Sequence, residues 1–340
     1  MTEFLATIHQ VALFAGTSTE TAYEVLHGGD RNSVGSGIDA RVRAAAAAVG
    51  YQRSADADGT WAPAPSIGLV GSAVAAPFAG HLLAGARDAA ADYGIGIILA
   101  NTSSDTDLED WDLQALLDRD PVGVIYTSHI HRIIGTPAAL ESVPHVLLNS
   151  SGPDPGTRSV VIDHCAAAYT AVNELLRHGH RRIGYIADHD NNLTVRARLE
   201  GHLAALAAGS ASQDPAFIAG DEPTSEGGLR AAAKLLDLQN PPTAVLCFND
   251  RMAMGAYQAA ADRGLRIPEQ LSVIGFDDLE LISDSLRPPL TTLHLPYYEM
   301  GRCAVYTLLD ILKNDPTHRT HQTALACRLI RRASVGPPAG

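Results

Sequence analysis

The chain has 340 residues, of which 46% are hydrophobic and 5% aromatic, and its formal net charge is −13. This length exceeds one ordinary core and predicts two or three compact units. The negative charge argues against attraction of the whole molecule to nucleic acid, although a local basic face would suffice for a DNA-binding protein. No apolar run is long enough to span a bilayer and no signal-peptide pattern occurs, so we expect a cytoplasmic protein.

Residues 1–51 have the pattern of three short helices. An apolar face predicts the first helix, and Gly16 ends it. The second helix begins with Ser18 or Thr19 as its cap, and the third is expected to use Asp39 as its cap. A tight turn between the first two helices is typical of a helix-turn-helix headpiece.

The segment that follows, "QRSADADGTWAPAP" at residues 52–65, is small, acidic and rich in proline. It has no apolar periodicity that would place it in a helix or a strand. We therefore predict a hinge or linker between the headpiece and the rest of the chain.

From residue 66 to residue 340, short β-type runs alternate with segments of helical length. Strands without polar alternation, separated by helices, predict an α/β fold of doubly wound parallel sheets covered on both faces. Two sets of such units predict a two-lobed core with a ligand cleft at the carboxyl ends of the strands. The expected N-lobe spans about 66–162 and 293–322, and the expected C-lobe spans about 163–292 and 323–336.

No motif for catalysis or for a cofactor emerges from the sequence. A phosphate-binding loop, a GxSxG elbow and an HExxH helix are all missing, so no catalytic residue is assigned. The pairs His129 with His131 and His178 with His180 have i, i+2 spacing but are flanked by polar residues. We interpret them as solvated surface histidines and expect no metal site and no cofactor.

Several stretches resemble the lactose-repressor (LacI/GalR) family of bacterial transcription regulators over nearly the whole chain. "TIHQVALFAGTS" and "ARVRAAAAAVGYQ" are similar to the first and third headpiece helices, and "RARLEGHLAAL" and "LIRRASV" to parts of the core. The most specific match is "FNDRMAMGAYQAAADRGLRIPEQLSVIGFDD". The resemblance implies a three-helix headpiece, a periplasmic-binding-protein-like core that binds a small effector, and a homodimer that reads two half-sites of operator DNA.

The resemblance also implies an effector site in the cleft. The positions that match the family's motifs are Phe78, Asn149, Arg198, Asn249, Asp250 and Asp277. Their chemistry suits a sugar-like or other polar small molecule, because a guanidinium and side-chain oxygens bind hydroxyls and an aromatic ring offers a stacking face. Asn149 departs from the aspartate common at its place, and Asp250 could instead cap the helix that begins there.

The headpiece departs from the family in charge. The implied DNA-binding positions are Thr7, Ser18, Thr19, Glu20, Thr21, Tyr23, Glu24, Arg31 and Arg53. Residues 1–60 hold four arginines against seven carboxylates, and no Lys or Arg precedes Arg31. A carboxylate can accept from a cytosine amino group, but two glutamates facing a polyanion oppose binding. In the linker, Asp56 stands where the family has a leucine that wedges into the minor groove.

Three classes of function therefore remain open. The first is an effector-responsive transcription regulator, most simply a repressor, that binds operator DNA as a homodimer. The second is a regulator-like protein that has lost operator binding and uses its cleft for ligands, or for catalysis, in which case His129, His131, Asp163 and His164 would be examined first. The third, a periplasmic transport receptor, is disfavoured by the headpiece and by the missing signal peptide.

Overall fold

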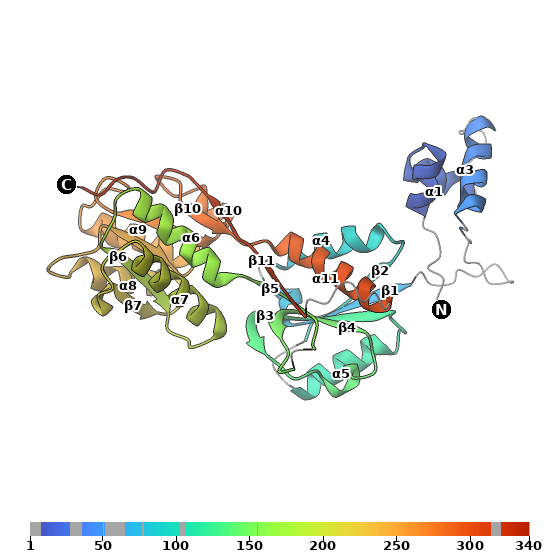
Figure 1. Cartoon of the computed structure of the whole chain (residues 1–340), viewed down its shortest axis with the longest axis horizontal. Coiled ribbons are helices and arrows are strands. Elements are labelled where there is room, and N and C mark those ends of the chain that lie inside the picture. Colours follow the sequence, from blue (N-terminus) through green and yellow to red (C-terminus); the bar gives the residue numbers. More distant parts are fainter. Residues whose placement is uncertain are drawn as a thin grey trace.

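The computed structural model of the protein describes residues 8–27, 36–49, 51, 65–76, 78–102, 106–154, 156–313 and 321–339. Within these ranges the chain forms a three-helix unit followed by two α/β lobes arranged in a row (Figure 1). The predicted fold class is therefore confirmed. Of the predicted linker, only Pro65 lies within the described residues.

The headpiece contains α1 (Ile8–Ala15), α2 (Thr19–His27) and α3 (Ser36–Ala48). Its small core consists of buried side chains from all three helices: Val11, Ala12, Ala15, Ala22, Val25, Val42, Ala45 and Ala46. Gly16 ends α1 with a φ of 62°, a left-handed conformation that suits glycine. The Ser18 hydroxyl accepts from the Thr21 amide at 3.1 Å, so Ser18 caps α2.

The prediction that Asp39 caps the third helix is wrong. The helix begins earlier, at Ser36, and Asp39 lies in its first turn. Its carboxylate binds the Arg43 guanidinium at 2.9 Å, one helical turn away. Asp39 therefore forms an ion pair with Arg43 along the helix instead of capping its first turn.

The N-lobe contains a six-stranded parallel sheet in the order β11-β5-β4-β3-β1-β2. Its strands are β1 (Ser66–Gly71), β2 (Gly96–Ala100), β3 (Gly123–Ile133), β4 (His145–Ser151), β5 (Ser159–Ile162) and β11 (Gln322–Leu325). Buried side chains of α4 (Ala79–Ala91) and α11 (Tyr297–Leu312) cover one face of the sheet. The other face is covered by α5 (Thr106–Leu117) and the 3₁₀ turn η2 (Ala138–Leu140), while a second such turn, η1 (Ser72–Ala75), follows β1.

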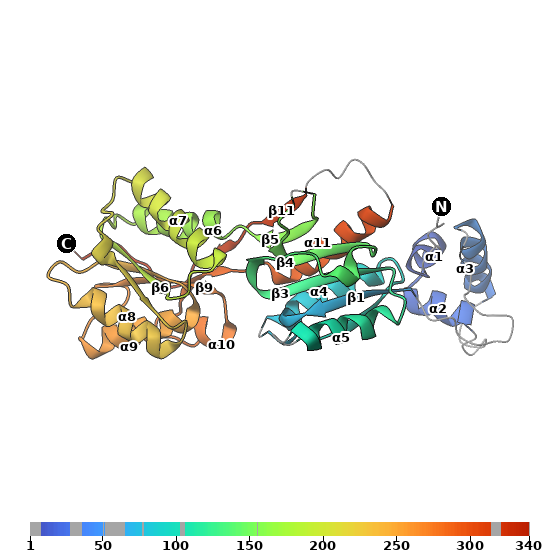
Figure 2. The same ribbon diagram turned by 90° about the horizontal axis from the view of Figure 1, so that it is seen from below.

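The C-lobe has the matching sheet β12-β10-β9-β8-β6-β7, parallel except for β12. Its strands are β6 (Ile183–Asp188), β7 (Ile218–Asp221), β8 (Ala244–Cys247), β9 (Ser272–Asp277), β10 (Thr291–His294) and β12 (Arg328–Ile330). Its helices are α6 (His164–Arg177), α7 (Leu193–Ala208), α8 (Ser225–Leu236), α9 (Asp250–Asp262) and the short α10 (Glu280–Ser283), and η3 (Pro215–Phe217) precedes β7. Helices α6 and α7 cover one face and α8 and α9 the other (Figure 2), so β8 buries Leu246 on one side and Val245 on the other.

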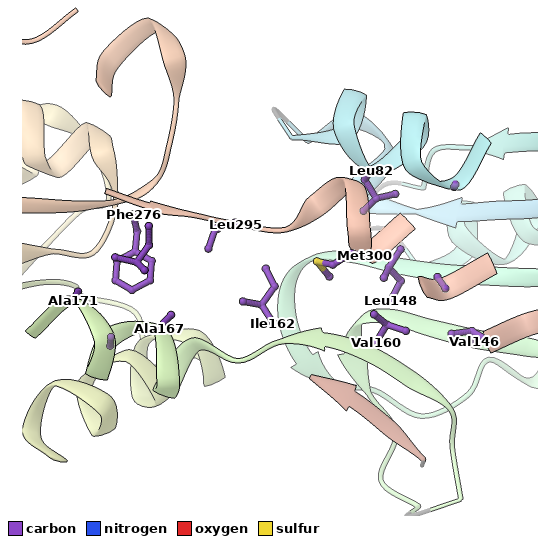
Figure 3. Close-up of a cluster of buried hydrophobic side chains, with 14 of the residues drawn as sticks. Leu82, Val146, Leu148, Val160, Ile162, Ala167, Ala171, Phe276, Leu295 and Met300 are labelled. Atoms are coloured by element: carbon purple, nitrogen blue, oxygen red, sulfur yellow. The ribbon is translucent and has the colours of Figure 1, made fainter. Parts of the chain in front are cut away.

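The chain passes between the lobes at three places: after β5, after β10 and after β11. The last crossing lies at residues 326–327, a few residues beyond the expected boundary at 322, because β11 pairs with β5 of the N-lobe. Buried apolar side chains continue through the crossings, with Ile162 and Leu295 between Phe276 on the C-lobe side and Met300 on the N-lobe side (Figure 3). Among the described residues, no helix combines the length and the apolar character that a membrane span requires.

Two glycines bring α4 and α11 into close contact. A Cβ added at Gly85 would lie 1.9 Å from the backbone oxygen of Tyr298, and one added at Gly301 would lie 2.1 Å from that of Leu82. These atoms belong to helix backbones, which cannot move aside as a flexible side chain can. The position of α11 against α4 therefore depends on glycine at both sites.

We expect Gly85→Ala to lower the free energy of unfolding by about 1–3 kcal/mol, because the added methyl group forces two packed helices apart. Urea unfolding followed by circular dichroism measures the change. Gly80→Ala, in the first turn of α4 with no atom within 4 Å of an added Cβ, is the matched control. It should be neutral or stabilising by up to about 1 kcal/mol, and equal effects of the two substitutions would contradict this account of the packing.

Candidate functional site

A cleft of about 950 Å³ lies between the two lobes. Its walls come mainly from residues at or just after the carboxyl ends of the parallel strands, where loops of both sheets meet. Polar side chains from both lobes line it, including His129, Asn149, Asp188, Arg198, Asn249 and Asp277. The volume is in the range of sites that enclose a small organic molecule.

Five of the six predicted effector residues line this cleft: Phe78, Asn149, Arg198, Asn249 and Asp277. The sixth, Asp250, does not. It is completely buried as the first residue of α9, and its carboxylate binds groups behind the cleft wall. The structure therefore does not support the direct effector contact that the motif implied for Asp250.

Arg198 on α7 is almost entirely buried, and its guanidinium is held on several sides. It lies 3.9 Å from the ring centre of Phe276 and 4.5 Å from that of Phe248, so two aromatic faces enclose the cation. It donates to the Phe248 backbone oxygen, and its Nε lies 3.4 Å from Nδ1 of His164. These contacts fix the orientation of its remaining N–H groups, which is the arrangement that a specific ligand contact needs.

His164 is neutral in this environment. Burial lowers its pKa well below the ordinary value, and the charges of Arg198 and His131 lower it further. Since Arg198 has only donors, His164 must accept at Nδ1 and carry its proton on Nε2. His164 therefore adds a neutral donor to the cleft wall.

Asp277 ends β9 in a left-handed backbone conformation. Its φ is 107° and that of the next residue, Asp278, is 57°, values that cost energy for residues other than glycine. Burial raises the pKa of Asp277 to about 6, although Arg198 and Arg251 lower it. At neutral pH the carboxylate is thus ionised but close to its titration range.

The Asp250 carboxyl group lies behind Asp277. Burial raises its pKa to about 8, followed by the charge of Asp277, whereas hydrogen bonds from Thr292 and the Leu279 amide lower it. The negative charge of Asp277 therefore disfavours ionisation of Asp250.

An aromatic wall completes the cleft on the N-lobe side. The rings of Phe78 and Tyr297 stack in parallel, with centroids 4.0 Å apart and an interplanar angle of 2°. Phe78 immediately precedes α4, and Tyr297 is the first residue of α11. The stack joins the starts of two packed helices and gives the cleft a flat apolar surface.

Two asparagines of the cleft have defined structural roles. Asn149 has a φ of 54° and donates from Nδ2 to the Ser128 backbone oxygen at 2.9 Å. Asn249 caps α9 by accepting from the Met252 amide at 2.7 Å and donates to the Pro223 backbone oxygen. Both side chains are held in place before any ligand arrives.

The histidines depart in part from their predicted surface positions. His129 and His131 line the cleft, where His131 Nε2 lies 3.0 Å from the Ser151 hydroxyl. His180 is fully buried and contacts Thr243 and Ser272, so its prediction as a solvated histidine is wrong. His180 lies in the polar run "RHGHRR", which gave no signal that residues of β8 and β9 would bury it.

Two further groups complete the comparison with the sequence. Asp163 caps α6 by accepting from the Ala166 amide at 2.9 Å and does not line the cleft. Tyr297, Asp188 and His294 line it but were not predicted, because each lies at a strand or helix end that periodicity alone does not locate. Within the described residues, no group of three or more His, Cys, Asp or Glu side chains is arranged to hold a metal ion.

On α1 and α2, the exposed side chains that the structure describes are apolar, polar or acidic, while the exposed cations Arg41 and Arg43 lie on α3. Leu13 and Phe14 on α1 are 74% and 70% exposed, and Tyr23 and Glu24 are exposed on α2. Thr19 is exposed and Thr21 is half-buried. Three of the predicted DNA contacts, Thr7, Arg31 and Arg53, lie outside the described residues, as does the side chain of Glu20.

One headpiece cation is committed to an internal contact. Arg43 binds Asp39 through Nε and Nη2 and also donates to the Val25 backbone oxygen at 3.0 Å. Arg43 therefore ties α3 to α2. Its charge is partly cancelled before any phosphate could approach.

The chain is similar to transcription regulators over nearly its full length. A family profile described as a periplasmic binding protein-like domain matches residues 172–335. The HTH-type transcriptional repressor CytR of Escherichia coli (strain K12) is 33% identical over 338 residues, 98% of this chain and 97% of that protein. The ribose operon repressor of Haemophilus influenzae is 30% identical over 332 residues, 97% and 99% respectively. The solved transcriptional regulator CelR–cellobiose complex has a TM-score of 0.67 at 27% identity, covering 97% of this chain and 99% of its own.

Asn149→Asp should destabilise the folded chain by about 1–3 kcal/mol at neutral pH, because a buried carboxylate oxygen would face the Ser128 carbonyl oxygen without a proton between them. The new carboxyl group would have a raised pKa in the folded state, so the loss should shrink as the pH falls and the group becomes protonated. Urea unfolding at pH 7.5 and pH 5 measures both effects.

Asn101→Asp is the matched control, because Asn101 is an exposed residue of the same cleft. We expect a change within about 0.5 kcal/mol. A loss at Asn149 that stays constant with pH would show that the hydrogen bond to Ser128 is not its cause.

Proposed function

This chain belongs to the LacI/GalR family of transcription regulators, and from that premise we propose that it is an effector-responsive repressor whose cleft binds a neutral, polyhydroxylated small molecule. The observation that carries the proposal is the cleft itself. It sets the oriented guanidinium of Arg198 and the carboxylate of Asp277 near the aromatic surface of Phe78 and Tyr297. Hydroxyl groups satisfy both the donor and the acceptor, and a sugar ring fits an aromatic face.

Charge supports a neutral ligand over an acidic one. Two arginines line the cleft, Arg198 and Arg251, against four carboxyl groups. Asp278 is compensated by Arg332, whose Nη2 lies 2.8 Å away, but Asp188 and Asp277 remain on the walls. A phosphate or carboxylate ligand would meet repulsion there. The cellobiose complex of the related structure is consistent with this choice.

Operator DNA is the second partner of the proposal. The headpiece keeps the three-helix scaffold, with Ser18 capping α2 and an apolar core beneath it. Operator binding would then depend on polar side chains of α2. The glutamates of this helix would accept hydrogen bonds from cytosine amino groups in the major groove. The exposed Glu24 on α2 and the ion pair that neutralises Arg43 also favour a second candidate function, a family member that senses ligands without binding an operator.

Fluorescence anisotropy with DNA from around the protein's own gene, followed across a salt series, tests the proposal. We expect sequence-dependent binding that weakens as salt increases and changes when D-ribose, cellobiose or a nucleoside is added. A complete lack of specific binding at low salt, with and without these compounds, would leave the ligand sensor as the function.

A double substitution, Glu20→Gln with Glu24→Gln, separates two roles for the glutamates. If they read cytosine amino groups, the variant loses affinity for the operator and keeps its weak affinity for unrelated DNA. If they only repel phosphates, the variant binds every sequence more tightly. The matched control is Glu226→Gln, a charge of the same sign on the exposed surface of α8 in the C-lobe.

We further propose that the chain is a homodimer through the face of the C-lobe formed by α9 and α10. Leu281 on α10 is 90% exposed, and Met254 on the adjacent α9 is also exposed. Large apolar side chains gathered on a surface suit an interface between copies of the chain, and a twofold pair of headpieces suits an operator with two half-sites.

Leu281→Asp should therefore raise the dissociation constant of the dimer at least tenfold, because it places two carboxylates in an apolar contact. Analytical ultracentrifugation over a concentration series measures the change. Leu13→Asp, an equally apolar exposed residue of the headpiece, should leave the dimer intact. An unchanged dimer in Leu281→Asp would place the interface elsewhere.

A further inference from the structure

The Asp250 carboxylate links three segments of the C-lobe behind the cleft. Its Oδ1 accepts from the Thr292 hydroxyl at 2.6 Å, and its Oδ2 accepts from the Leu279 amide at 2.8 Å. The first bond joins α9 to β10, and the second joins α9 to the turn that follows β9. Asp250 itself is completely buried and lies outside the cleft lining.

The neighbouring strand is adapted to this carboxylate. A Cβ added at Gly275 of β9 would lie only 2.2 Å from Oδ1 of Asp250. Glycine at this position thus creates the space that the carboxylate occupies. The close packing of α9, β9 and β10 around Asp250 restricts the orientation of its carboxylate.

The turn that Asp250 holds is the one that directs Asp277 into the cleft. The left-handed conformations of Asp277 and Asp278 cost energy and persist only where surrounding contacts enforce them. Asp278 is fixed by Arg332 at 2.8 Å and by His294 Nδ1 at 3.2 Å. The Leu279 amide, on the other side of the strained pair, is fixed by Asp250.

We propose that Asp250 is a positioning residue for Asp277: its two hydrogen bonds fix the turn from Asp277 to Leu279 and so direct the Asp277 side chain into the cleft. The proposal rests on the proposed function where it takes Asp277 as an effector contact. The anchoring of the turn rests on the two hydrogen bonds of Asp250 and on the space that Gly275 leaves for its carboxylate. It assigns Asp250 a role in ligand recognition without a ligand contact.

The surroundings of the two groups decide where the proton stays. Asp277 faces the cations Arg198 and Arg251, together with the neutral groups of Tyr297 and Cys327. Asp250 faces Asp277, Asp278 and the Cys247 thiol, with the Thr292 hydroxyl and the Leu279 amide as its donors. The arginines favour a charge on Asp277, so the proton remains on Asp250. Asp277 is then available as an acceptor for ligand hydroxyls, and effector affinity should fall as acidification protonates it.

The first test uses the full chain without any effector. Asp250→Asn keeps both contacts, since the amide oxygen can accept from Leu279 and the amide nitrogen can donate to the Thr292 hydroxyl, but it removes the titrating group. Between pH 5.5 and pH 8.5 the folded wild type holds a proton on Asp250 that the unfolded chain has released, so wild-type stability falls with rising pH. We expect the melting temperature of Asp250→Asn relative to wild type to rise across this window.

Asp262→Asn, at the exposed end of the same helix, is the control and should show a pH-independent difference. A flat difference for Asp250→Asn would show that Asp250 is ionised throughout this range and would overturn its coupling to Asp277. Thr292→Val is a second variant. It removes a hydrogen bond that lowers the pKa of Asp250, so that pKa should rise and the decline of stability should extend to higher pH. No such shift would also contradict the proposal.

A double-mutant cycle tests the coupling between the two carboxyl groups. The gain from Asp250→Asn at pH 8 should shrink in the Asp277→Asn background, because the charge that repels Asp250 is then gone. If the effects of the two substitutions on stability are additive, Asp250 and Asp277 are independent. That result would reject the coupling between them.

Calorimetry with D-ribose and cellobiose as probes separates this inference from the proposed function. With a probe that binds wild type, Asp277→Asn should lose binding. Asp250→Asn keeps both contacts to the turn, so it should raise the dissociation constant of the probe by less than tenfold. Full loss in Asp250→Asn with unchanged melting would make Asp250 a direct contact and overturn the positioning role. Failure of both probes with every variant would count against the proposed ligand class only, because the melting data and the cycle are obtained without ligand.

Discussion

The buried guanidinium of Arg198 is the interaction on which the cleft depends. A cation removed from water must find its partners within the protein, and Arg198 finds two aromatic faces, the Phe248 backbone oxygen and the neutral ring of His164. These contacts bring together α7, the loop after β8 and the start of α6. The charge of Arg198 in turn favours the ionised form of Asp277. One side chain thus sets the geometry and the electrostatics of the C-lobe wall.

Strands with an apolar run could be predicted from the local sequence. Strands and side-chain roles that depend on distant partners could not. The first nine strands could be predicted because each contains a short apolar run, which in β8 is buried throughout. The short strands β10 to β12 could not, because Thr291, Thr292 and Gln322 are polar and their pairing depends on distant partners. Asp39 and His180 were misplaced for the same reason: the salt bridge with Arg43 and the burial against Ser272 are known only once the chain is folded.

The cleft residues illustrate the same limit at the level of single side chains. The resemblance to the family's motifs led to Phe78, Asn149 and Arg198, and the structure places all three in one cleft. A motif, however, does not distinguish a residue that touches the ligand from one that supports its neighbour. Asp250 is adjacent to Asn249 in sequence, yet the helix start turns one side chain toward the cleft and the other into the interior.

Strand β1 gives the cleft a direct covalent path to the headpiece. It starts at Ser66, immediately after the linker, and ends at Gly71, from which η1 leads to Phe78 at the cleft. Phe78 stacks on Tyr297, and α4 and α11 meet at Gly85 and Gly301. A ligand that draws Phe78 toward Arg198 would therefore move α4 and α11 as one unit, because neither helix can shift without displacing the backbone of the other. Because η1 contacts both α4 and β1, such a movement would also reach the strand that follows the linker.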